Sequence, residues 1–239
     1  MIGAMEKSKQ DRRIEARRRA AGKNYQMRDI GEGFVSPSID AIGQALLEVD
    51  RHLEWATARS RMLPMLPRRQ APWFPPETTP IRITVPPGIP VMVAVDIGPA
   101  WILLTREVTD EWALDDGILV AHALENLRSR LSQVGPEDLQ QERLADLPVR
   151  ILRTGLDCAS GLLLVPDELP RILGPGPQCL IAPMRDLLIS LPADADRAIV
   201  GELNDALATA DPRGLALDAF LFDGGALRYE TLTAAGAPR

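Results

Sequence analysis

The hydrophobic residues in the second half of the chain follow two periods, one of about two residues and one of about 3.6. Runs that alternate with polar residues, or that are apolar throughout, predict strands. These strands are IRITV (81–85), VMVAV (91–95), WILLTREV (101–108), VRILRTG (149–155), GLLLV (161–165), QCLIA (178–182), ALDAFLF (216–222) and ALRYE (226–230). Turns at Gly98-Pro99 and Asp223-Gly224-Gly225 favour antiparallel pairing of their neighbours.

Helices are predicted between these strands. One apolar stripe is formed by Val120, Leu124, Leu127 and Leu131. Residues 195–210 form a second amphipathic segment and residues 166–173 a shorter one, whereas 137–148 fit a short polar helix or an excursion and 183–191 fit a strand or a helix. Strands and helices that mix without strict alternation predict an α+β fold, with a mixed, mainly antiparallel sheet and packed helices.

The segment before this domain has the pattern of an amphipathic helix. Ser36-Pro37 has the form of a helix start, a capping serine followed by proline at the first helical position. Apolar residues then recur at spacings of three and four, at Ile39, Ile42, Leu46, Val49, Leu53 and Ala56. This seam is shorter than a coiled coil requires. The helix either packs on its own domain or pairs with a partner or a second copy through Ile42, Leu46, Val49 and Leu53.

Prolines crowd the next segment, since nine of the 21 lie between Pro64 and Pro90. Proline fixes φ and removes an amide donor, so we expect neither a helix nor a central strand to persist there. Residues 64–80 are predicted to form a stiff connector. It carries Trp73 and Phe74, which we expect to lie in a groove of this protein or of a partner, because an exposed aromatic pair is costly.

These patterns divide the 239 residues into five parts. They are a basic flexible arm (1–35), an amphipathic helix (36–63), a Pro-rich connector (64–80), an α+β domain (81–232) and a flexible tail (233–239). With 46% hydrophobic and 25% charged residues the chain has the composition of a globular protein, and its length allows one principal core.

Charge is distributed unevenly along the chain. Up to residue 70 there are 14 basic against 9 acidic residues, and after it 13 against 24, so the two parts carry charges of +5 and −11. Five arginines of the arm are Arg12, Arg13, Arg17, Arg18 and Arg19. The arm is either mobile or a docking segment for a polyanion or an acidic protein face. Tyr25 is the one aromatic residue within 6–28, the basic part of the arm, so nucleic acid is not the expected partner.

Several kinds of chemistry lack their sequence signature. No lysine follows Lys23, and there is no Gly-rich phosphate loop and no Gly-x-Ser-x-Gly elbow. His52 and His122 have no second ligand at metal spacing, so we expect no metal and no cofactor. Paired carboxylates such as Asp115-Asp116 and Asp194 with Asp196 fall at predicted helix starts, where acids stabilise the helix dipole.

The chain is expected to be a cytoplasmic protein. It has two cysteines and no apolar signal segment near its start. The longest apolar run, Val91 to Leu104, is interrupted by Asp96 and is shorter than the roughly 20 residues that cross a bilayer. No transmembrane helix is therefore predicted.

One possible polar site stands out. Arg185-Asp186 follows a predicted strand, and Asp157 with Cys158 lies between two others. Arg185 and Asp186 form either a structural ion pair or part of a binding site. Asp157 raises the pKa expected for the Cys158 thiol, which favours a buried structural cysteine over a nucleophile.

Several blocks follow one another in a set order within residues 101–192, and they include Thr109, Ala123 to Leu127, Ala159 to Leu164 and Pro183 to Asp186. Their order resembles that in a family of uncharacterised bacterial cytosolic proteins classed as a domain of unknown function. The resemblance implies an α+β cytosolic domain and assigns no catalytic residue. Gly161 stands where that family has serine.

These observations lead to three functional hypotheses. We expect a non-enzymatic adaptor or regulatory module, in which the N-terminal arm and helix recruit a protein partner or a second copy. A hydrolase or transferase with a site near Asp157, Cys158, Arg185 and Asp186 is the first alternative. An acidic, immunity-type neutraliser of a basic protein is the second.

Overall fold

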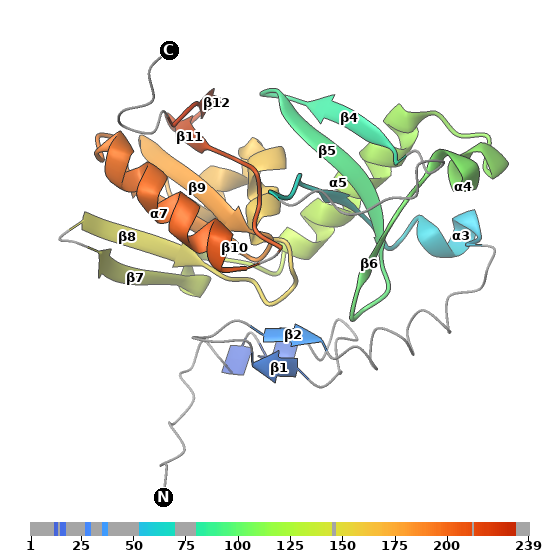
Figure 1. Ribbon diagram of the computed structural model, residues 1–239, viewed down its shortest axis with the longest axis horizontal. Helices are drawn as coiled ribbons and strands as arrows, with labels where there is room; N and C mark the ends of the chain where they lie inside the picture. Colours follow the sequence, from blue (N-terminus) through green and yellow to red (C-terminus); the bar gives the residue numbers. More distant parts are fainter. Residues whose placement is uncertain are drawn as a thin grey trace, which may run out of the picture.

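Two antiparallel sheets form the body of the molecule (Figure 1). The computed structural model describes residues 12–13, 15–17, 27–29, 35–37, 53–69, 80–144, 147–211 and 213–232. The combination of these sheets with packed helices confirms the predicted α+β class. No helix within the described ranges is long and apolar enough to cross a bilayer.

The first sheet is built around β5 (Ile89–Asp96). β3 (Met62–Met65) pairs with one edge of β5, and β4 (Arg82–Val85) and β6 (Trp101–Leu103) pair in succession with the other. Every residue of β5 except Pro90 is buried, as the continuous apolar run predicts. Pro64 pairs within β3, an edge strand, where a missing amide is tolerated. Residues 62–66 thus belong to the body of the domain. The sequence pattern predicts residues 62–63 in the amphipathic helix and residues 64–66 in the Pro-rich connector.

The second sheet has six strands in the order β12-β11-β9-β10-β8-β7, all antiparallel. Their bounds are β7 (Leu139–Leu144), β8 (Leu147–Leu152), β9 (Gln178–Met184), β10 (Leu187–Pro192), β11 (Ala219–Phe222) and β12 (Leu227–Glu230). The β11–β12 hairpin turns at Asp223-Gly224-Gly225 as predicted, because the Asp223 carboxylate accepts from the amides of Gly225 and Ala226.

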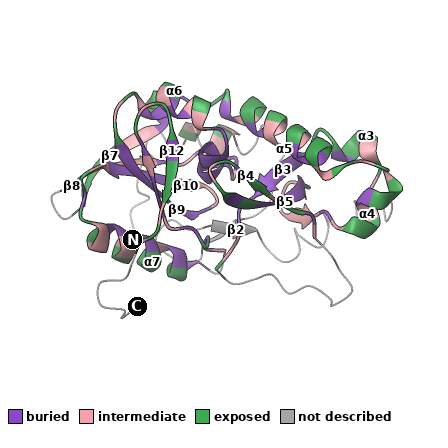
Figure 2. Ribbon diagram, turned by 90° about the horizontal axis from the view of Figure 1, so that it is seen from above, coloured by how far each residue is buried: buried purple, intermediate pink, exposed green. Residues whose placement is uncertain are grey.

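Helices cover both faces of this sheet. Figure 2 shows α6 (Leu169–Leu173) on one side and α7 (Arg197–Ala210) on the other, with α5 (Asp116–Leu131) running beside the first sheet. Alternate residues divide between two hydrophobic clusters: Leu180 and Leu188 face the large one, and Ile181 and Ile189 face the cluster under α7. The remaining short helices are α3 (Trp55–Ala58), α4 (Arg106–Glu111), η1 (Pro136–Asp138), η2 (Ala159–Leu164) and η3 (Pro166–Glu168).

The predicted stripe of α5 faces the large cluster through Val120, Leu127 and Leu131, with Leu124 partly buried. Acidic side chains cap the first turns of the two long helices, α5 and α7. Asp115 accepts from the Gly117 amide at 2.7 Å, and Asp196 accepts from the Ala198 amide at 2.7 Å.

A short backbone ladder joins the two sheets. The Arg69 amide donates to Gly214 O at 2.9 Å, and the Ala216 amide donates to Pro67 O at 2.9 Å. The Leu215 amide donates to Pro183 O of β9 at 2.8 Å. The continuation of β3 is therefore tied to the segment after α7, and that segment is tied to the second sheet.

Three predicted elements take a different form. WILLTREV is a strand only over β6, and its residues 106–108 begin α4. GLLLV lies in η2, a buried 3-10 helix, because the neighbouring edge of β8 is already paired with β10. Gly161 lets η2 approach α5, since a Cβ there would lie 2.7 Å from Leu127 Cδ1. The polar segment within 137–148 forms η1 and then β7, which pairs with β8 along its whole length and forms the outer edge of the sheet.

The described parts of the front segment also differ from the prediction. Residues 12–13 and 15–17 are helical, and β1 (Met27–Asp29) pairs with β2 (Val35–Pro37). Ser36-Pro37 thus lies in a short strand and not at a helix start, since the pairing with Met27 and Arg28 requires an extended backbone. Of the predicted helix over 36–63, residues 38–52 lie outside the described residues.

Two glycines, one inside α7 and one in the segment after it, are expected to respond oppositely to alanine. A Cβ at Gly201, inside α7, would come no closer than 3.8 Å to Leu232, so Gly201→Ala should raise the free energy of unfolding by about 0.5–1 kcal/mol. A Cβ at Gly214 would lie 1.8 Å from Ala208 O, so Gly214→Ala should lower it by about 3 kcal/mol or more. Urea denaturation measures both, and changes of the same sign would contradict the described packing.

Candidate functional site

The loop after β8 folds around the carboxylate of Asp186, which lies in the turn between β9 and β10. Asp186 accepts from the amides of Thr154 at 3.1 Å, Gly155 at 2.7 Å and Ala159 at 3.4 Å, and from the Thr154 hydroxyl. The Thr154 Oγ1 in turn accepts from the Leu156 amide at 3.0 Å. One side chain therefore fixes the backbone of a whole loop that has no ladder partner.

The charge of this carboxylate is set by opposing effects. Burial and the nearby Asp157 raise the pKa of Asp186, while the hydrogen bonds from Thr154 and Gly155 lower it and offset part of that rise. Asp157 itself has a φ of 56°, in the left-handed region that asparagine and aspartate tolerate best among the larger residues.

Cys158 lies at the back of this loop and is buried, with its Sγ 3.6 Å from Thr154 Oγ1. Burial, and after it the nearby Asp186, raises the pKa of its thiol to about 12. Cys179 is buried on the α7 side of the sheet, where burial raises its thiol pKa to about 11. The two thiols belong to different hydrophobic clusters, and both are protonated at neutral pH.

Arg185 is fixed through its backbone by the same loop. Its carbonyl oxygen accepts from the amide of Ser160 at 3.0 Å and from the Ser160 hydroxyl at 2.8 Å. Its guanidinium lies over the ring of Trp101, 3.9 Å from the centroid, and donates to Met65 Sδ at 3.7 Å. Arg185 therefore spans the joint between the second sheet and the face of the first.

Two more arginines lie at this joint. Arg68 forms a bridge with Leu215, and Arg213, two residues earlier than Leu215, donates to the carboxylate of Asp211 at 2.9 and 3.1 Å. Burial lowers the pKa of Arg185 to about 10, with Arg68 and Arg213 contributing to the decrease and Asp157 opposing it. Burial, and after it Arg213, also lowers the pKa of Arg68. We call Arg68, Arg185, Arg213 and Trp101 the arginine junction.

The arginine junction has donors that the described chain leaves unused. Arg185 and Arg68 form no ion pair with a described carboxylate within 4 Å, and Arg68 makes no side-chain hydrogen bond there. The indole Nε1 of Trp101 is buried and has no acceptor among those residues. Buried donors without an acceptor call for an explanation, and a bound anion is one that suits a cluster of guanidinium groups.

The structure brings all four residues of the sequence-predicted polar site together. Asp186 accepts hydrogen bonds from the loop that carries Asp157 and Cys158. Arg185 forms no ion pair with Asp186, and its guanidinium stacks on Trp101 instead. Sequence reasoning missed Arg68, Arg213 and Trp101, which come from three segments whose proximity depends on the ladder between the sheets. Their spacing along the chain carries no signal of that proximity.

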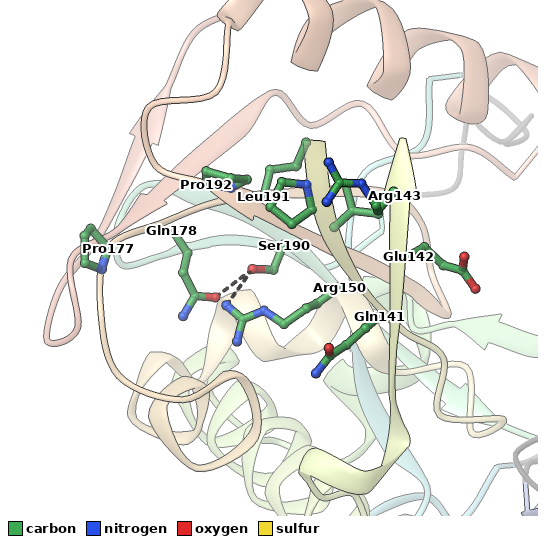
Figure 3. A pocket seen from close by; sticks show the side chains of 11 residues that line it. Gln141, Glu142, Arg143, Arg150, Pro177, Gln178, Ser190, Leu191 and Pro192 are labelled. Atoms are coloured by element: carbon green, nitrogen blue, oxygen red, sulfur yellow. Dashed lines mark hydrogen bonds between the residues drawn. The ribbon is translucent and has the colours of Figure 1, made fainter. Parts of the chain in front are cut away.

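A cleft of about 710 Å³ opens at one end of the second sheet (Figure 3). Its polar centre is a chain of hydrogen bonds in which Arg150 donates to Ser190 Oγ at 3.2 Å and the Ser190 hydroxyl donates to Gln178 Oε1 at 2.7 Å. Gln178 Nε2 donates on to Gly174 O at 3.2 Å and Leu173 O at 3.5 Å. No motif of the sequence analysis pointed to these residues.

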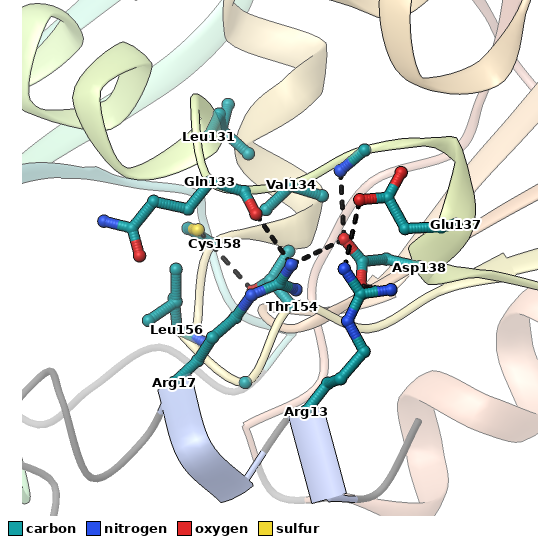
Figure 4. A network of polar contacts seen from close by, with 12 residues as sticks. Arg13, Arg17, Leu131, Gln133, Val134, Glu137, Asp138, Thr154, Leu156 and Cys158 are labelled. Carbon is teal, nitrogen blue, oxygen red and sulfur yellow. Dashed lines mark hydrogen bonds and ion pairs between the residues drawn. The ribbon is translucent and has the colours of Figure 1, made fainter. Parts of the chain in front are cut away.

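Part of the basic arm binds its own chain (Figure 4). Arg17 donates to Gln133 O at 2.6 Å and to the Asp138 carboxylate at 2.7 Å, and Arg13 donates to Glu137 at 3.0 Å. The Arg17 and Asp138 side chains are only 12% and 2% exposed. These two arginines of the predicted partner-binding set are therefore already engaged, whereas Arg12 is exposed.

The other predicted partner-binding residues are less informative. Leu53 is partly buried against the large hydrophobic cluster, which places it on its own domain. The positions outside the described residues are Arg18, Arg19, Ile42, Leu46, Val49, Trp73 and Phe74. No group of three or more potential metal ligands occurs within the described part of the chain.

Comparison with protein-family models, with curated proteins and with solved structures finds no match to this chain. The resemblance over residues 101–192 therefore stays a prediction. Any functional proposal depends on the geometry of the described residues.

The two thiols are expected to resist alkylation in the folded protein. Because their pKa values lie at about 12 and 11 and both are buried, iodoacetamide at neutral pH should modify neither Cys158 nor Cys179 until urea unfolds the chain. Mass spectrometry of digested protein measures each site. Selective modification of native Cys158 would restore it as a candidate nucleophile.

The docked arm should contribute measurably to stability. Arg17→Gln removes a charge-assisted hydrogen bond to a buried carboxylate and should lower the free energy of unfolding by about 2 kcal/mol. Arg12→Gln makes the same charge change at an exposed position and should change it by less than about 0.5 kcal/mol. Equal effects of the two variants in urea denaturation would show that the arm does not hold this position in solution.

Proposed function

We propose that this chain is a non-catalytic interaction module whose arginine junction binds an acidic segment of a protein partner. The observation that carries the proposal is the Arg185 guanidinium, stacked 3.9 Å over Trp101 with no described carboxylate within ion-pairing distance. Stacking holds the planar guanidinium in place, so less conformational freedom is lost when its donors bind a carboxylate.

The surrounding charge supports selectivity for one docking position. Residues 71–239 carry a net charge of −11, which repels an acidic segment from most of this surface. Arg68 and Arg213 are close enough to lower the pKa of Arg185, Arg213 also lowers the pKa of Arg68, and the carboxylate of Asp211 forms a direct ion pair with Arg213. A local excess of positive charge on an acidic body favours one binding site and disfavours the others.

A hydrolase or transferase at the same place has weaker support. Cys158 is buried with a thiol pKa of about 12, and the Asp186 carboxylate accepts hydrogen bonds from three backbone amides. A nucleophile must be deprotonated and reachable, and a general base must have a free lone pair near the substrate. The hydrogen bonds around Asp186 instead hold Arg185 in position.

Binding of a Glu-rich peptide tests this proposal directly. A fluorescein-labelled hexaglutamate peptide should bind the full chain with an affinity that falls as salt is added, and Arg185→Gln should weaken it at least about tenfold. Arg228→Gln, at an exposed hairpin position, is the matched control and should leave the affinity within about twofold. Fluorescence anisotropy measures both.

A second readout locates the contact. The Trp101 indole N–H has no acceptor in the described part of the chain, so its resonance should shift when the peptide binds. Trp101→Phe identifies that resonance among the four tryptophans. Absence of peptide binding, or equal weakening in the Arg185 and Arg228 variants, would refute the proposed function.

A further inference from the structure

The cleft at the end of the second sheet is a separate place from the arginine junction. It is lined by strand residues of β7, β8 and β10 and by the start of β9. Three of its lining residues are the prolines Pro148, Pro177 and Pro192. Prolines fix the backbone and offer no amide donor, so the walls are stiff and the polar side chains supply the hydrogen-bonding groups there.

Four of the polar residues that line the cleft form one row across the sheet. Arg150 of β8 is directly opposite Gln141 of β7 and Ser190 of β10, so all three side chains point from the same face. Gln178 lies two residues before Leu180, the partner of Ser190, and therefore shares that face. Figure 3 shows the four side chains gathered around one space.

This row lies beside a strongly apolar region. Leu152 and Leu188, which continue the same face, belong to the large hydrophobic cluster, and Ser190 and Gln178 are 2% and 4% exposed. Burying Ser190 and Gln178, and part of Arg150, beside such a core costs free energy that apolar residues of similar size would not. The hydrogen bonds from Arg150 through Ser190 to Gln178 offset part of that cost and hold the guanidinium in place.

The charge of Arg150 has no acidic partner among the residues that the structure describes. Its guanidinium donates to Leu173 O and Ser190 Oγ, and no described carboxylate lies within ion-pairing distance of it. Burial alone accounts for the lowered pKa of Arg150. Glu142 lines the same cleft but is opposite Val149, on the other face of the sheet, and Figure 3 shows it pointing away from Arg150.

We infer that this cleft binds a small carboxylate, which takes the place of the missing acidic partner of Arg150. The Arg150 guanidinium retains unused N–H donors, and the exposed Gln141 amide beside it adds a further donor and acceptor. A carboxylate fits better than a phosphate, because the row around Arg150 offers a single guanidinium and the prolines of the cleft offer no amide donors, whereas phosphate sites use several backbone N–H groups. The second arginine that lines the cleft, Arg143, lies opposite Pro148, one position further along the same face.

A single added carboxylate tests this inference inside the protein. Gln141→Glu places an acid opposite Arg150, where it forms the ion pair that the ligand would otherwise form and so competes with it. Gln140→Glu makes the same change one residue earlier, opposite Ile151 and on the other face. Neither position belongs to the hydrogen-bonded chain of Arg150, Ser190 and Gln178, so both variants are expected to fold.

Acetate, succinate and benzoate serve as probes of increasing size, with succinamide as the neutral control, in calorimetric titrations of the full chain. We expect saturable binding of at least one carboxylate and none of succinamide. Gln141→Glu should weaken that binding at least about tenfold, and Gln140→Glu should leave it within about twofold. Arg185→Gln, in the arginine junction, should also leave it unchanged, which separates this site from the proposed function.

Two results would overturn the inference. One is the absence of saturable binding for all three carboxylates to a chain whose urea denaturation shows that it is folded. The other is carboxylate binding that Gln141→Glu and Gln140→Glu weaken equally, because a site at Arg150 must distinguish the two faces of β7.

Discussion

The hydrogen bonds that Asp186 accepts from the loop after β8 hold the centre of this molecule together. That loop has no strand beside it, and its amides would otherwise be buried without acceptors. By binding three of them, one carboxylate closes the loop onto the turn between β9 and β10. Ser160, which follows this loop, then donates its amide and its hydroxyl to the carbonyl oxygen of Arg185. The position of the arginine follows from the position of the aspartate.

Guanidinium groups without acidic partners recur in the described structure. Arg185 and Arg68 lie at the joint between the sheets, and Arg150 lies at the end of the second sheet. In each case burial lowers the arginine pKa, which means that the protein holds a charge in an environment that disfavours it. Arg13 and Arg17 differ, because acids of their own chain neutralise them. This contrast separates arginines that stabilise the fold from those that remain available to a ligand.

The sequence by itself determined the fold class and most of the strands. Alternation and apolar runs identified β4, β5 and β9, the turn at Asp223-Gly224-Gly225 identified the last hairpin, and the stripe of α5 faces the core as its spacing indicates. These features are local, because a residue's neighbours along the chain decide which face it presents. The pattern also singled out Arg185 and Asp186, since they follow a strand, although it suggested an ion pair that does not form.

Only the tertiary structure decided what those residues do. GLLLV has the composition of a strand, but it lies between α5 and the loop around Asp186, where no strand edge is free, and so it forms a 3-10 helix. Arg68 and Trp101 reach Arg185 only because a backbone ladder between segments that are far apart in the sequence joins the two sheets. Register likewise placed Gln141 opposite Arg150. Contacts between distant segments depend on packing that no local pattern encodes, which is why the candidate sites emerged from the fold and not from the sequence.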